Sequence, residues 1–501
     1  MKKVIFILSL ICCVACSKKN CDNTAIPDEP FRPAYHFSPP QNWCNDPNGM
    51  VYYAGEYHLF YQHNPKGSKW GNMSWGHAVF TDLATWEHLP VALLPDSLGD
   101  IFSGCAVVDE LNTAGFQQGD EKTLLAFYTY NKNGVGQSQA LAYSTDKGRT
   151  WTKYAQNPVI AAPSGKPDFR DPKVFWYAPE NKWIMVLAVN QVIEFYSSKN
   201  AKDWIFESEF GTNYGCHDAV WECPDLFEIP LEGEQKGAWV LLVNNSRNGD
   251  NSGSATQYFV GNFDGKKFVC EQPAENTTAL WLDYGKDHYA MVTWANAPDN
   301  RRIGLAWMSN WEYANDTPTE NFRSAMSVPR ELTLVNKNGK YLLKNYPVKE
   351  IENFRGETSD FSDIKIAENH IIKNLPSSGI YEILLNFEKQ NAHSFGFLLK
   401  NNKDEKVTLM LDFEQNKFTT DRTKSGIVDF NEHFPAVTVA PFTTKNAYQL
   451  HVLVDRCSVE AFLDSGKVAM TNLVFPNKPY SEIEFFGDNI KVNNLKINKI
   501  Q

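Results

Sequence analysis

Ser144-Thr145-Asp146-Lys147-Gly148-Arg149-Thr150-Trp151 is a polar turn that follows a strand-like segment and closes with a tryptophan. Similar turns run from Thr81 to Trp86 and from Ser197 to Trp204, so the pattern recurs about every 55 to 65 residues. A repeat of this length is typical of four-stranded blades arranged radially, in which each blade covers the edge of its neighbour. We therefore predict a five-bladed β-propeller around a polar-lined central funnel. The comparable places in its blades would be Asp46, Ser103, Asp171, Glu222 and Asp283.

The segments between these turns have the composition of strands. Val51 to Gln62 and Trp183 to Phe195, for example, are rich in aromatic and β-branched residues and are bounded by Gly, Pro, Asn and Asp. Because Trp86, Trp151 and Trp204 recur with the repeat, we expect them to pack at the blade edges and not to bind a ligand.

The last third of the chain has a different composition. All fourteen tryptophans lie between Trp43 and Trp311. Beyond them, buried-type residues alternate with polar ones, as at Tyr381, Ile383, Leu385 and Phe387 and again at Val407, Leu409, Leu411 and Phe413. One apolar face per strand, without helical periodicity, predicts an antiparallel β-sandwich. The change falls near Leu343 to Phe354, so we predict a propeller over residues 33–345 and a sandwich over residues 355–501.

The first residues resemble an export signal. Lys2-Lys3 precede an apolar run from Val4 to Ala15 that is too short to span a bilayer. Val14-Ala15-Cys16 resembles the end of a bacterial lipobox, although Cys13 stands where an aliphatic residue is usual. We therefore expect a signal over residues 1–16, a linker over residues 17–32, and lipid attachment at Cys16 to a bacterial membrane or cell surface. The alternative is a plain secretory signal that releases a periplasmic or secreted protein.

Charge and composition narrow the range of partners. The formal net charge is -11 and no long basic run occurs, which argues against nucleic acid or an anionic membrane surface as a partner. The eleven histidines are scattered and no HExxH motif occurs, so we expect neither a metal site nor a cofactor. The cysteines beyond the signal are irregularly spaced and are interpreted as small buried thiols. The sequence leaves open whether a disulfide forms and what the oligomeric state is.

Three short strings place a carboxylate in a proline-fixed turn: Trp43-Cys44-Asn45-Asp46-Pro47-Asn48-Gly49, Phe169-Arg170-Asp171-Pro172 and Trp221-Glu222-Cys223-Pro224-Asp225. Proline presets the backbone and removes a hydrogen-bond donor. One such string alone would be best explained as a capped turn. In a propeller, however, equivalent turns of successive blades face the central axis, so the three carboxylates would meet in one pocket.

These strings resemble the signature blocks of the β-fructosidases of glycoside hydrolase family 32, the invertases, inulinases and levanases. The resemblance covers nearly the whole mature chain. Further matching blocks are Asn64-Pro65 with Trp70-Gly71, Phe102-Ser103-Gly104-Cys105, Asp283-Tyr284-Gly285 with Asp287 and Tyr289, and Asp455-Arg456-Cys457-Ser458-Val459-Glu460. The chain departs from the family at Cys44, where Met is common, and at Cys105, where Ser is common. Neither change touches a reacting oxygen.

The resemblance implies a retaining glycosidase in which Asp46 is the nucleophile, Glu222 is the general acid/base, and Asp171 orients the fructosyl hydroxyls. Such an enzyme needs one ionised carboxylate to attack the anomeric carbon and one protonated carboxyl to release the leaving oxygen. We expect donors in the surrounding turn to keep the pKa of Asp46 low. Arg170 is interpreted as the partner of a carboxylate that limits repulsion among the three, with a purely structural ion pair as the alternative.

The same resemblance implies a pocket for a terminal fructosyl unit. A sugar presents apolar ring faces and polar edges, so its site combines aromatic platforms with amide and hydroxyl groups. The residues implied are Asn45, Gln62, Trp70, Phe102, Ser103, Tyr289 and Trp311.

The segments Trp307 to Tyr313 and Phe322 to Leu332 look more like levanases and inulinases than like dedicated sucrases. Fructan, either levan or inulin, is therefore the favoured substrate, with sucrose as a further one. The alternatives are a surface fructan-binding propeller without catalysis and an inverting furanosidase on a similar scaffold; fructosyl transfer would be a side activity of the same intermediate. We predict a structural role for the sandwich, in which Asp455 and Glu460 form ion pairs or strand-end contacts beside Arg456.

Overall fold

The computed structural model describes residues 28–501 with the exception of residues 235, 247–250, 272–278 and 367–369. The predicted signal, Cys16 and the linker up to residue 27 lie outside the described residues. Within the described residues, helix is confined to three short 3₁₀ turns: η1 (Ala178–Glu180), η2 (Pro298–Asn300) and η3 (Lys349–Phe354). None of the helices in this described part has the length and apolar character needed to cross a membrane.

The first module consists of five sheets, each built on four antiparallel strands. Blade 1 contains β1 (Asn42–Tyr53), β2 (Glu56–Asn64), β3 (Ser74–Phe80) and β4 (Trp86–Leu93), and β20 (Phe322–Arg323) pairs with β1 in parallel. Blade 2 contains β5 (Asp100–Asp109), β6 (Thr123–Lys132), β7 (Gly136–Ser144) and β8 (Thr152–Lys153). Blade 3 contains β9 (Phe169–Tyr177), β10 (Lys182–Val189), β11 (Val192–Ser198) and β12 (Ile205–Phe210).

Blades 4 and 5 complete the module. Blade 4 contains β13 (Trp221–Pro230), β14 (Gly237–Asn245), β15 (Ala255–Phe263) and β16 (Phe268–Cys270), with β17 (Leu280–Trp281) paired to β15. Blade 5 contains β18 (Tyr289–Thr293), β19 (Ile303–Met308), β22 (Arg330–Lys337) and β23 (Lys340–Pro347), with β21 (Ala325–Met326) paired to β19.

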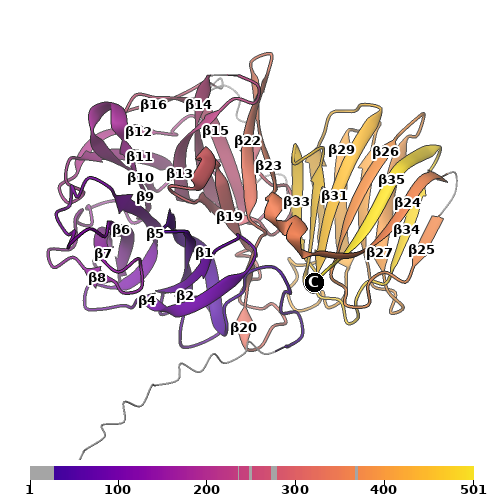
Figure 1. Ribbon diagram of the computed structural model, residues 1–501, viewed down its shortest axis with the longest axis horizontal. Helices are drawn as coiled ribbons and strands as arrows, with labels where there is room; N and C mark the ends of the chain where they lie inside the picture. Colours follow the sequence, from indigo (N-terminus) through magenta and orange to yellow (C-terminus); the bar gives the residue numbers. More distant parts are fainter. Residues whose placement is uncertain (1–27, 235, 247–250, 272–278, 367–369) are drawn as a thin grey trace, which may run out of the picture.

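The first strands of the blades form a closed ring around the axis. Each of β1, β5, β9 and β13 packs against the first strand of the next blade, and β18 packs against β1. The backbone joins blades 5 and 1 directly, because Ala295 N donates to Met50 O and Tyr52 N donates to Ala295 O, each at 2.9 Å. The predicted five-bladed propeller is thus confirmed (Figure 1).

The tryptophan turns lie before the outermost strand of the first three blades. Trp86 begins β4, and Trp151 and Trp204 stand just before β8 and β12. The Trp151 ring of blade 2 meets the Phe60 ring of blade 1 edge to face at 5.4 Å. In the same way, Trp204 of blade 3 meets Phe127 of blade 2 at 5.7 Å. Trp151 and Trp204 therefore pack between blades as predicted, whereas Trp86 packs on Phe80 of its own blade and on Phe37 of the segment before it.

Two segments predicted as strands each contain a turn. Val51 to Gln62 holds the end of β1 and most of β2, separated by Ala54 and Gly55, which both have positive φ angles. Trp183 to Phe195 likewise joins β10 to β11 through a turn at Asn190, where φ is 53°. Tight hairpin turns favour left-handed residues such as Gly and Asn. Both segments are thus hairpins.

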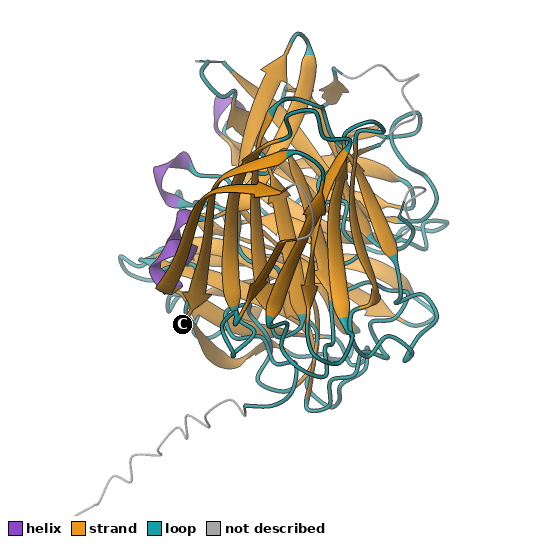
Figure 2. Cartoon of the chain, turned by 90° about the vertical axis from the view of Figure 1, so that its right-hand side faces the viewer, coloured by secondary structure: helices purple, strands orange, loops and turns teal. Residues whose placement is uncertain are grey.

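The second module is the predicted antiparallel sandwich of two six-stranded sheets (Figure 2). The first sheet has the order β24 (Arg355–Ile366), β35 (Ile490–Ile500), β26 (Tyr381–Glu388), β31 (Ala447–Asp455), β32 (Ser458–Leu463) and β33 (Val468–Leu473). The second has the order β25 (His370–Lys373), β34 (Glu482–Gly487), β27 (Ser394–Lys400), β28 (Lys406–Asp412), β29 (Lys417–Lys424) and β30 (Val437–Pro441).

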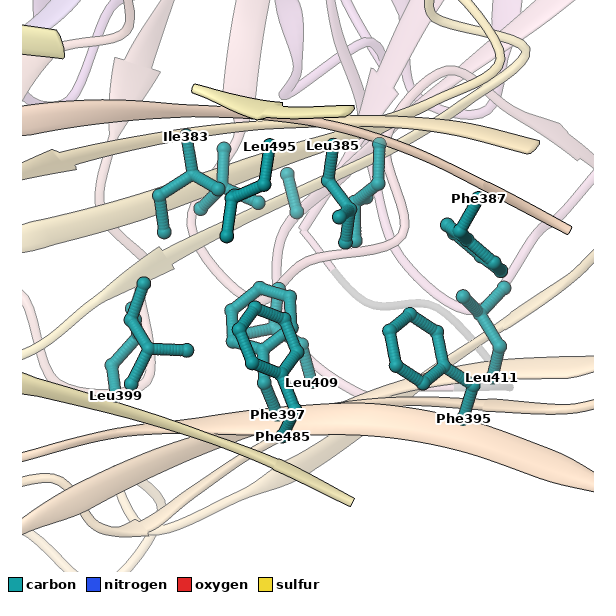
Figure 3. Packing of buried hydrophobic residues seen from close by; sticks show 14 of the residues in the cluster. Ile383, Leu385, Phe387, Phe395, Phe397, Leu399, Leu409, Leu411, Phe485 and Leu495 are labelled. Atoms are coloured by element: carbon teal, nitrogen blue, oxygen red, sulfur yellow. The ribbon is translucent and has the colours of Figure 1, made fainter. Parts of the chain in front are cut away.

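Alternating residues fill the space between these sheets. Ile383, Leu385 and Phe387 of the first sheet point toward Phe395 and Phe397 of the second (Figure 3). Each of these side chains is at most 1% exposed. The period-two pattern in the sequence therefore marks the buried face correctly.

The outer face of the first sheet packs on the propeller, with β33 beside β23 (Figure 1). Leu453, Phe462 and Ala469 join a buried cluster with propeller residues. Gly285 lies so close to β33 that a Cβ placed there would stand 2.0 Å from Thr471 O. The two modules therefore meet backbone to backbone at this point.

A buried ionic network crosses the same interface. Arg330 of blade 5 bonds to Asp283 at 2.8 Å and to Glu460 of the sandwich at 2.5 Å. His36, in the segment before blade 1, donates from Nδ1 to Asp455 Oδ2 at 2.8 Å and from Nε2 to Glu460 Oε2 at 2.7 Å. One prediction is corrected here: Asp283 belongs to this network and is not the fifth equivalent place in the blades. The predicted ion pairs and strand-end contact of Asp455 and Glu460 are confirmed, because both carboxylates pair with buried cations and Arg456 N donates to Asp455 Oδ1 at 2.7 Å. The Arg456 guanidinium itself pairs with Asp28.

Candidate active site

The first strand of every blade carries a β-bulge at an equivalent point. In β1, for example, Cys44 and Pro47 pair with His63 and Tyr61, so two residues of the inner strand face the single residue Gln62. The same two-against-one slip occurs in the other four inner strands. The five bulged pairs are Asn45–Asp46, Phe102–Ser103, Asp171–Pro172, Cys223–Pro224 and Ala290–Met291. Bulges re-aim side chains and are common beside active sites.

The bulges of blades 3 to 5 share a backbone conformation that few residues adopt. Asp171, Cys223 and Ala290 each have a positive φ angle, of 64°, 43° and 55°. A left-handed non-glycine residue is strained, and such strain persists where the surrounding structure enforces it. Here the ring of inner strands enforces it at the same position in three neighbouring blades.

Asp46 is held from both sides of its carboxylate. Ser103 Oγ of the next blade donates to Asp46 Oδ2 at 2.6 Å, and Asn45 Nδ2 donates to Asp46 Oδ1 at 2.9 Å. Asn45 is fixed in turn by Trp43, whose Nε1 donates to Asn45 Oδ1 at 2.7 Å. The carboxylate therefore has one fixed orientation toward the axis.

Cys223 links the carboxylates of blades 1 and 3 to blade 4. Its backbone N donates to Asp171 Oδ2 at 2.9 Å. Its Sγ lies 3.5 Å from Asp46 Oδ2 and 3.6 Å from Asp171 Oδ2. Because Cys223 directly follows Glu222, all three predicted carboxylates meet at one place. Cys223 was not predicted as a site residue, although it stands inside one of the three proline-fixed strings.

Glu222 receives two donors from neighbouring blades. Arg170 of blade 3 donates to Glu222 Oε1 through Nη2 at 2.9 Å and through Nε at 3.2 Å. The hydroxyl of Tyr289 of blade 5 donates to Glu222 Oε2. Arg170 also contacts Asp168 at 2.5 Å and Asp171 at 3.9 Å. The guanidinium thus offsets the negative charge of three acidic groups at once.

Burial dominates the electrostatics of the cluster. Burial, together with the neighbouring Glu222 carboxylate, raises the pKa of Asp46 despite its three hydrogen-bond donors. The predicted low pKa of Asp46 is therefore wrong in direction. Burial raises the pKa of Asp171 to about 7 even though Arg170 opposes this, and Glu222 and Asp46 add to the rise. Burial and Glu222 also raise the pKa of the Tyr289 hydroxyl, which stays a proton donor.

The remaining predicted residues surround this cluster. Phe102 precedes Ser103 in the bulge of blade 2, and its ring meets the Trp70 ring edge to face at 6.0 Å. Trp70 is 46% exposed, and its backbone N donates to Asn315 Oδ1 at 3.0 Å. Trp311 stacks on Trp43 with the ring centres 5.9 Å apart. Two exposed or half-buried aromatic platforms therefore lie near the carboxylates.

Gln62 is the single residue opposite the Asn45–Asp46 bulge. Its side chain is buried, and its Nε2 has no hydrogen-bond partner among the described residues. A hydroxyl of a bound sugar would satisfy this donor. In blade 2 the equivalent residue is Thr129, which was not predicted: its Oγ1 accepts a 3.0 Å bond from Asp171 N. Only strand pairing reveals this role, since no motif marks Thr129 in the sequence.

A narrow pocket on the axis is lined by Ser103, Asp171 and Cys223, beneath the carboxylates. In the described part of the chain, no group of three or more His, Cys, Asp or Glu side chains is placed so that it could hold a metal ion. The site itself presents carboxylates held by a guanidinium, a phenol and a hydroxyl.

Comparison with known proteins adds independent findings. The N-terminal domain model of glycosyl hydrolases family 32 matches residues 36–346, and the C-terminal model matches residues 350–499. A levanase of Bacillus subtilis (strain 168) is 47% identical over 509 residues, covering 100% of this chain and 74% of that protein. An extracellular exo-inulinase of Aspergillus awamori is 38% identical over 90% of each protein. The crystal structure of exo-inulinase from Aspergillus awamori superposes with a TM-score of 0.88 at 36% identity, over 95% of this chain and 99% of that one.

Proposed function

Since the chain belongs to glycosyl hydrolases family 32 over both of its modules, we propose that Asp46, Glu222 and Asp171 carry out the retaining hydrolysis of β-fructofuranosidic bonds. The protein is a β-fructosidase that acts on fructans, in keeping with its relation to a levanase and an exo-inulinase. One observation carries the assignment of roles: Cys223, the neighbour of Glu222, touches both Asp46 and Asp171. The alternative of a fructan-binding propeller without catalysis has no comparable support.

In the first step, Asp46 attacks the anomeric carbon of the terminal fructosyl unit while Glu222 gives its proton to the departing glycosidic oxygen. The bonds from Ser103 and Asn45 fix the attacking carboxylate. Arg170 and Tyr289 fix Glu222 from the other side. The product of this step is a fructosyl ester of Asp46 and a free leaving group.

In the second step, Glu222 is ionised and takes a proton from a water molecule. That water attacks the anomeric carbon, the ester bond breaks, and the Asp46 carboxylate is restored. Asp171, whose pKa lies at about 7 because it is buried among other charges, acts as a hydrogen-bond partner for fructosyl hydroxyls. A sugar hydroxyl in place of water would give fructosyl transfer.

Methanolysis tests the stereochemical course. A retaining enzyme converts a fructan in dilute methanol to methyl β-fructofuranoside, which proton NMR distinguishes from the α anomer. Asp46→Asn and Glu222→Gln should each lower kcat roughly a thousandfold or more without a change in thermal midpoint. Glu222→Gln should keep much of its fructosylation rate on fructosyl fluoride, whose leaving group needs no proton. Glu357→Gln, at an exposed strand position, is the matched control. The α anomer, or near-native activity of either site variant on fructan, would refute the roles.

Fructan is the proposed main substrate, with sucrose as a further one. The exposed Trp70 platform at the mouth of the site suits a chain that continues beyond the terminal unit. Product analysis on sucrose, inulin and levan tests this: a higher kcat/KM on a fructan than on sucrose is expected. Fructose as the sole early product means cleavage from chain ends, whereas oligosaccharides mean internal cleavage. A strict preference for sucrose would contradict the proposal.

The enzyme is exported, which agrees with the extracellular exo-inulinase among its relatives. Lipid attachment at Cys16 is a further proposal that rests on the Val14-Ala15-Cys16 string. Cys16→Ala should move the protein from the membrane fraction to the soluble fraction with unchanged turnover. Wild-type protein found wholly in the soluble fraction, with another residue as its mature N-terminus, would exclude the anchor.

A further inference from the structure

A second pocket opens at the far end of the inner strands. Its volume is about 370 Å³, and its walls come from the ends of β5, β9 and β13 and from the segment after β18. The bulges of the active site lie at the starts of the same strands. On β9, Trp176 of the pocket stands five residues beyond Asp171, which is about 16 Å at roughly 3.3 Å per residue. The two pockets therefore open on opposite ends of the propeller.

A buried ion pair separates the two pockets. Lys173 Nζ lies 3.0 Å from Asp225 Oδ2 and donates to Thr293 O at 2.8 Å. Lys173 lines the axial pocket beneath the carboxylates on one side and this rear pocket on the other. A molecule bound in the rear pocket consequently cannot reach Asp46 or Glu222, so the rear pocket has no part in the hydrolysis already described.

The rear pocket has the wall composition of a sugar site. Its aromatic side chains are Phe175, Trp176, Trp183, Phe227 and Trp239. Of these, Trp176 and Trp239 are partly exposed. The exposed side chains of Glu110, Glu228 and Asn296 stand at its edge. Aromatic faces bordered by polar groups complement the apolar faces and hydroxylated edges of a saccharide.

Two buried polar atoms of residues that line this pocket have no hydrogen-bond partner among the described residues. Arg302 lies over the Phe227 ring at 4.7 Å and donates to Glu228 O at 3.2 Å, yet its buried Nε is unpaired. Asp225 Oδ1 is likewise buried and unpaired. A buried donor or acceptor without a partner is costly, so a ligand that supplies the partner gains affinity.

The mixture of positive and negative side chains around the pocket favours a neutral ligand. An anion would pair with Arg302 but would be repelled by Asp225 and Glu228, and a cation would be repelled by Arg302 and Lys173. A hydroxyl group both donates and accepts, so neighbouring hydroxyls of one sugar can satisfy the carboxylate oxygen and the guanidinium together. The volume also lies in the range of small-ligand sites.

We propose that the rear pocket is a non-catalytic binding site for a fructosyl segment of a neutral fructan chain, where the identity of the sugar rests on the proposed function. Such a site holds the enzyme on polymeric substrate while the carboxylates act on the polymer at the opposite face. A second contact on the same polymer raises the local concentration of cleavable bonds without changing the chemical step.

The test separates polymer binding from turnover. Retention in native gels that contain levan or inulin is measured for the full chain carrying Asp46→Asn, which leaves the polymer intact. Trp176→Ala and Arg302→Gln are added separately, the first removing an aromatic platform and the second a guanidinium donor while every aromatic ring is kept. Phe206→Ala removes a 51% exposed aromatic ring of β12 and is the matched control. Native gels that contain dextran show whether the protein is retained by any neutral polysaccharide and not by fructan alone.

Each rear variant should weaken retention by fructan at least fivefold, whereas Phe206→Ala should have no effect. In the active enzyme, the same variants should raise KM on fructan and leave kcat/KM on sucrose within about twofold. Unchanged fructan retention in both rear variants, or equal retention by dextran, would overturn the proposal. Failure of the proposed function would look different, because wild-type enzyme would then release neither fructose nor fructo-oligosaccharides from any of the three substrates.

Discussion

At the scale of single residues, Asp171 shows a conflict between stability and function. It is 5% exposed, lies near two other carboxylates, and has the Arg170 guanidinium at 3.9 Å. Burial accordingly raises its pKa from 3.8 to about 7. A carboxyl group with a raised pKa binds its proton more tightly in the folded state than in the unfolded state. It therefore destabilises the fold progressively as pH rises from about 4 to 7, and by the full amount above 7.

We predict that Asp171→Asn lowers kcat on fructan but stabilises the protein in a pH-dependent way. The gain in the free energy of unfolding should be small at pH 4.5 and on the order of 1–4 kcal/mol at pH 8, since the shift spans about three pKa units and the loss of the Arg170 contact offsets part of it. Urea denaturation at the two pH values measures it.

Asp82→Asn supplies a control of opposite sign. Hydrogen bonds from Thr85 lower the pKa of Asp82, although the partial burial of the carboxylate opposes this shift. Asp82→Asn should therefore lower the free energy of unfolding at pH 8 and change it little at low pH, where the carboxyl group is protonated. A gain for Asp171→Asn that is equal at pH 4.5 and pH 8 would show that its charge is not the cause.

At the scale of elements, the β-bulge is the feature that builds the site. The sequence identifies Asp46, Asp171 and Glu222, because each stands in a string whose proline limits the backbone. It cannot identify Thr129, because a bulge is a property of two paired strands. For the same reason it cannot show that Tyr289 and Glu222 occupy the same position, directly before the bulge of their inner strands. Asp283 was misplaced for the same reason: its Asp-Tyr-Gly string resembles a site turn, yet it lies before β18 and bonds to Arg330.

Thr129 gives a direct test of how one blade positions a carboxylate of the next. Its Oγ1 accepts from Asp171 N and donates to Gln139 Oε1 at 2.8 Å. We predict that Thr129→Val, which keeps the shape but removes the acceptor, lowers kcat several-fold and destabilises the protein by about 1–3 kcal/mol. Steady-state kinetics and thermal unfolding measure the two effects.

Thr123→Val is the matched substitution at the start of the same strand. The Thr123 hydroxyl is buried and has no hydrogen-bond partner among the described residues, so its removal should leave both kcat and stability unchanged or slightly improve stability. If the two valine variants behaved alike, the contact between Thr129 and Asp171 would have no role in the site.

At the scale of the whole molecule, the two modules are joined by ion pairs whose side chains are buried in the propeller and in the sandwich alike. Although burial alone would lower it, the hydrogen bonds with Asp455 and Glu460 raise the pKa of His36 to about 9. Arg330 and Asp283 continue the network into blade 5. The period-two pattern predicted the sandwich, but the ion-pair partners of Asp455 and Glu460 lie 130 or more positions away, which no local pattern specifies.

The raised pKa of His36 predicts a loss of stability at alkaline pH. The protonated imidazole stabilises the folded state fully below about pH 6.5, and this contribution is lost as pH rises through 9. The shift corresponds to roughly 3 kcal/mol. We predict that His36→Gln removes this pH dependence of the free energy of unfolding. At pH 6, kcat should stay within about twofold of the wild-type value, because the three active-site carboxylates do not contact His36.

His393→Gln serves as the surface control. His393 pairs with Glu414 at 2.6 Å, but both side chains are about 70% exposed, so solvent screens the pair. Its replacement should not alter the pH profile of stability between 6.5 and 9. A wild-type profile that is retained in His36→Gln would locate the alkaline transition in another group.

The five equivalent bulges also bear on how such an enzyme can change over generations. One kink, repeated in each blade, sets five bulged pairs on the inner strands, and here they are Asn45–Asp46, Phe102–Ser103, Asp171–Pro172, Cys223–Pro224 and Ala290–Met291. Because the bulge is a property of strand pairing and not of the side chain it carries, one bulged pair can change while the other four are kept. Blade 5 carries Ala290 and Met291, which are fully buried and have no ionisable group. Substitutions confined to this pair would thus alter the packing beside the site while the three carboxylates and their partners remain in place.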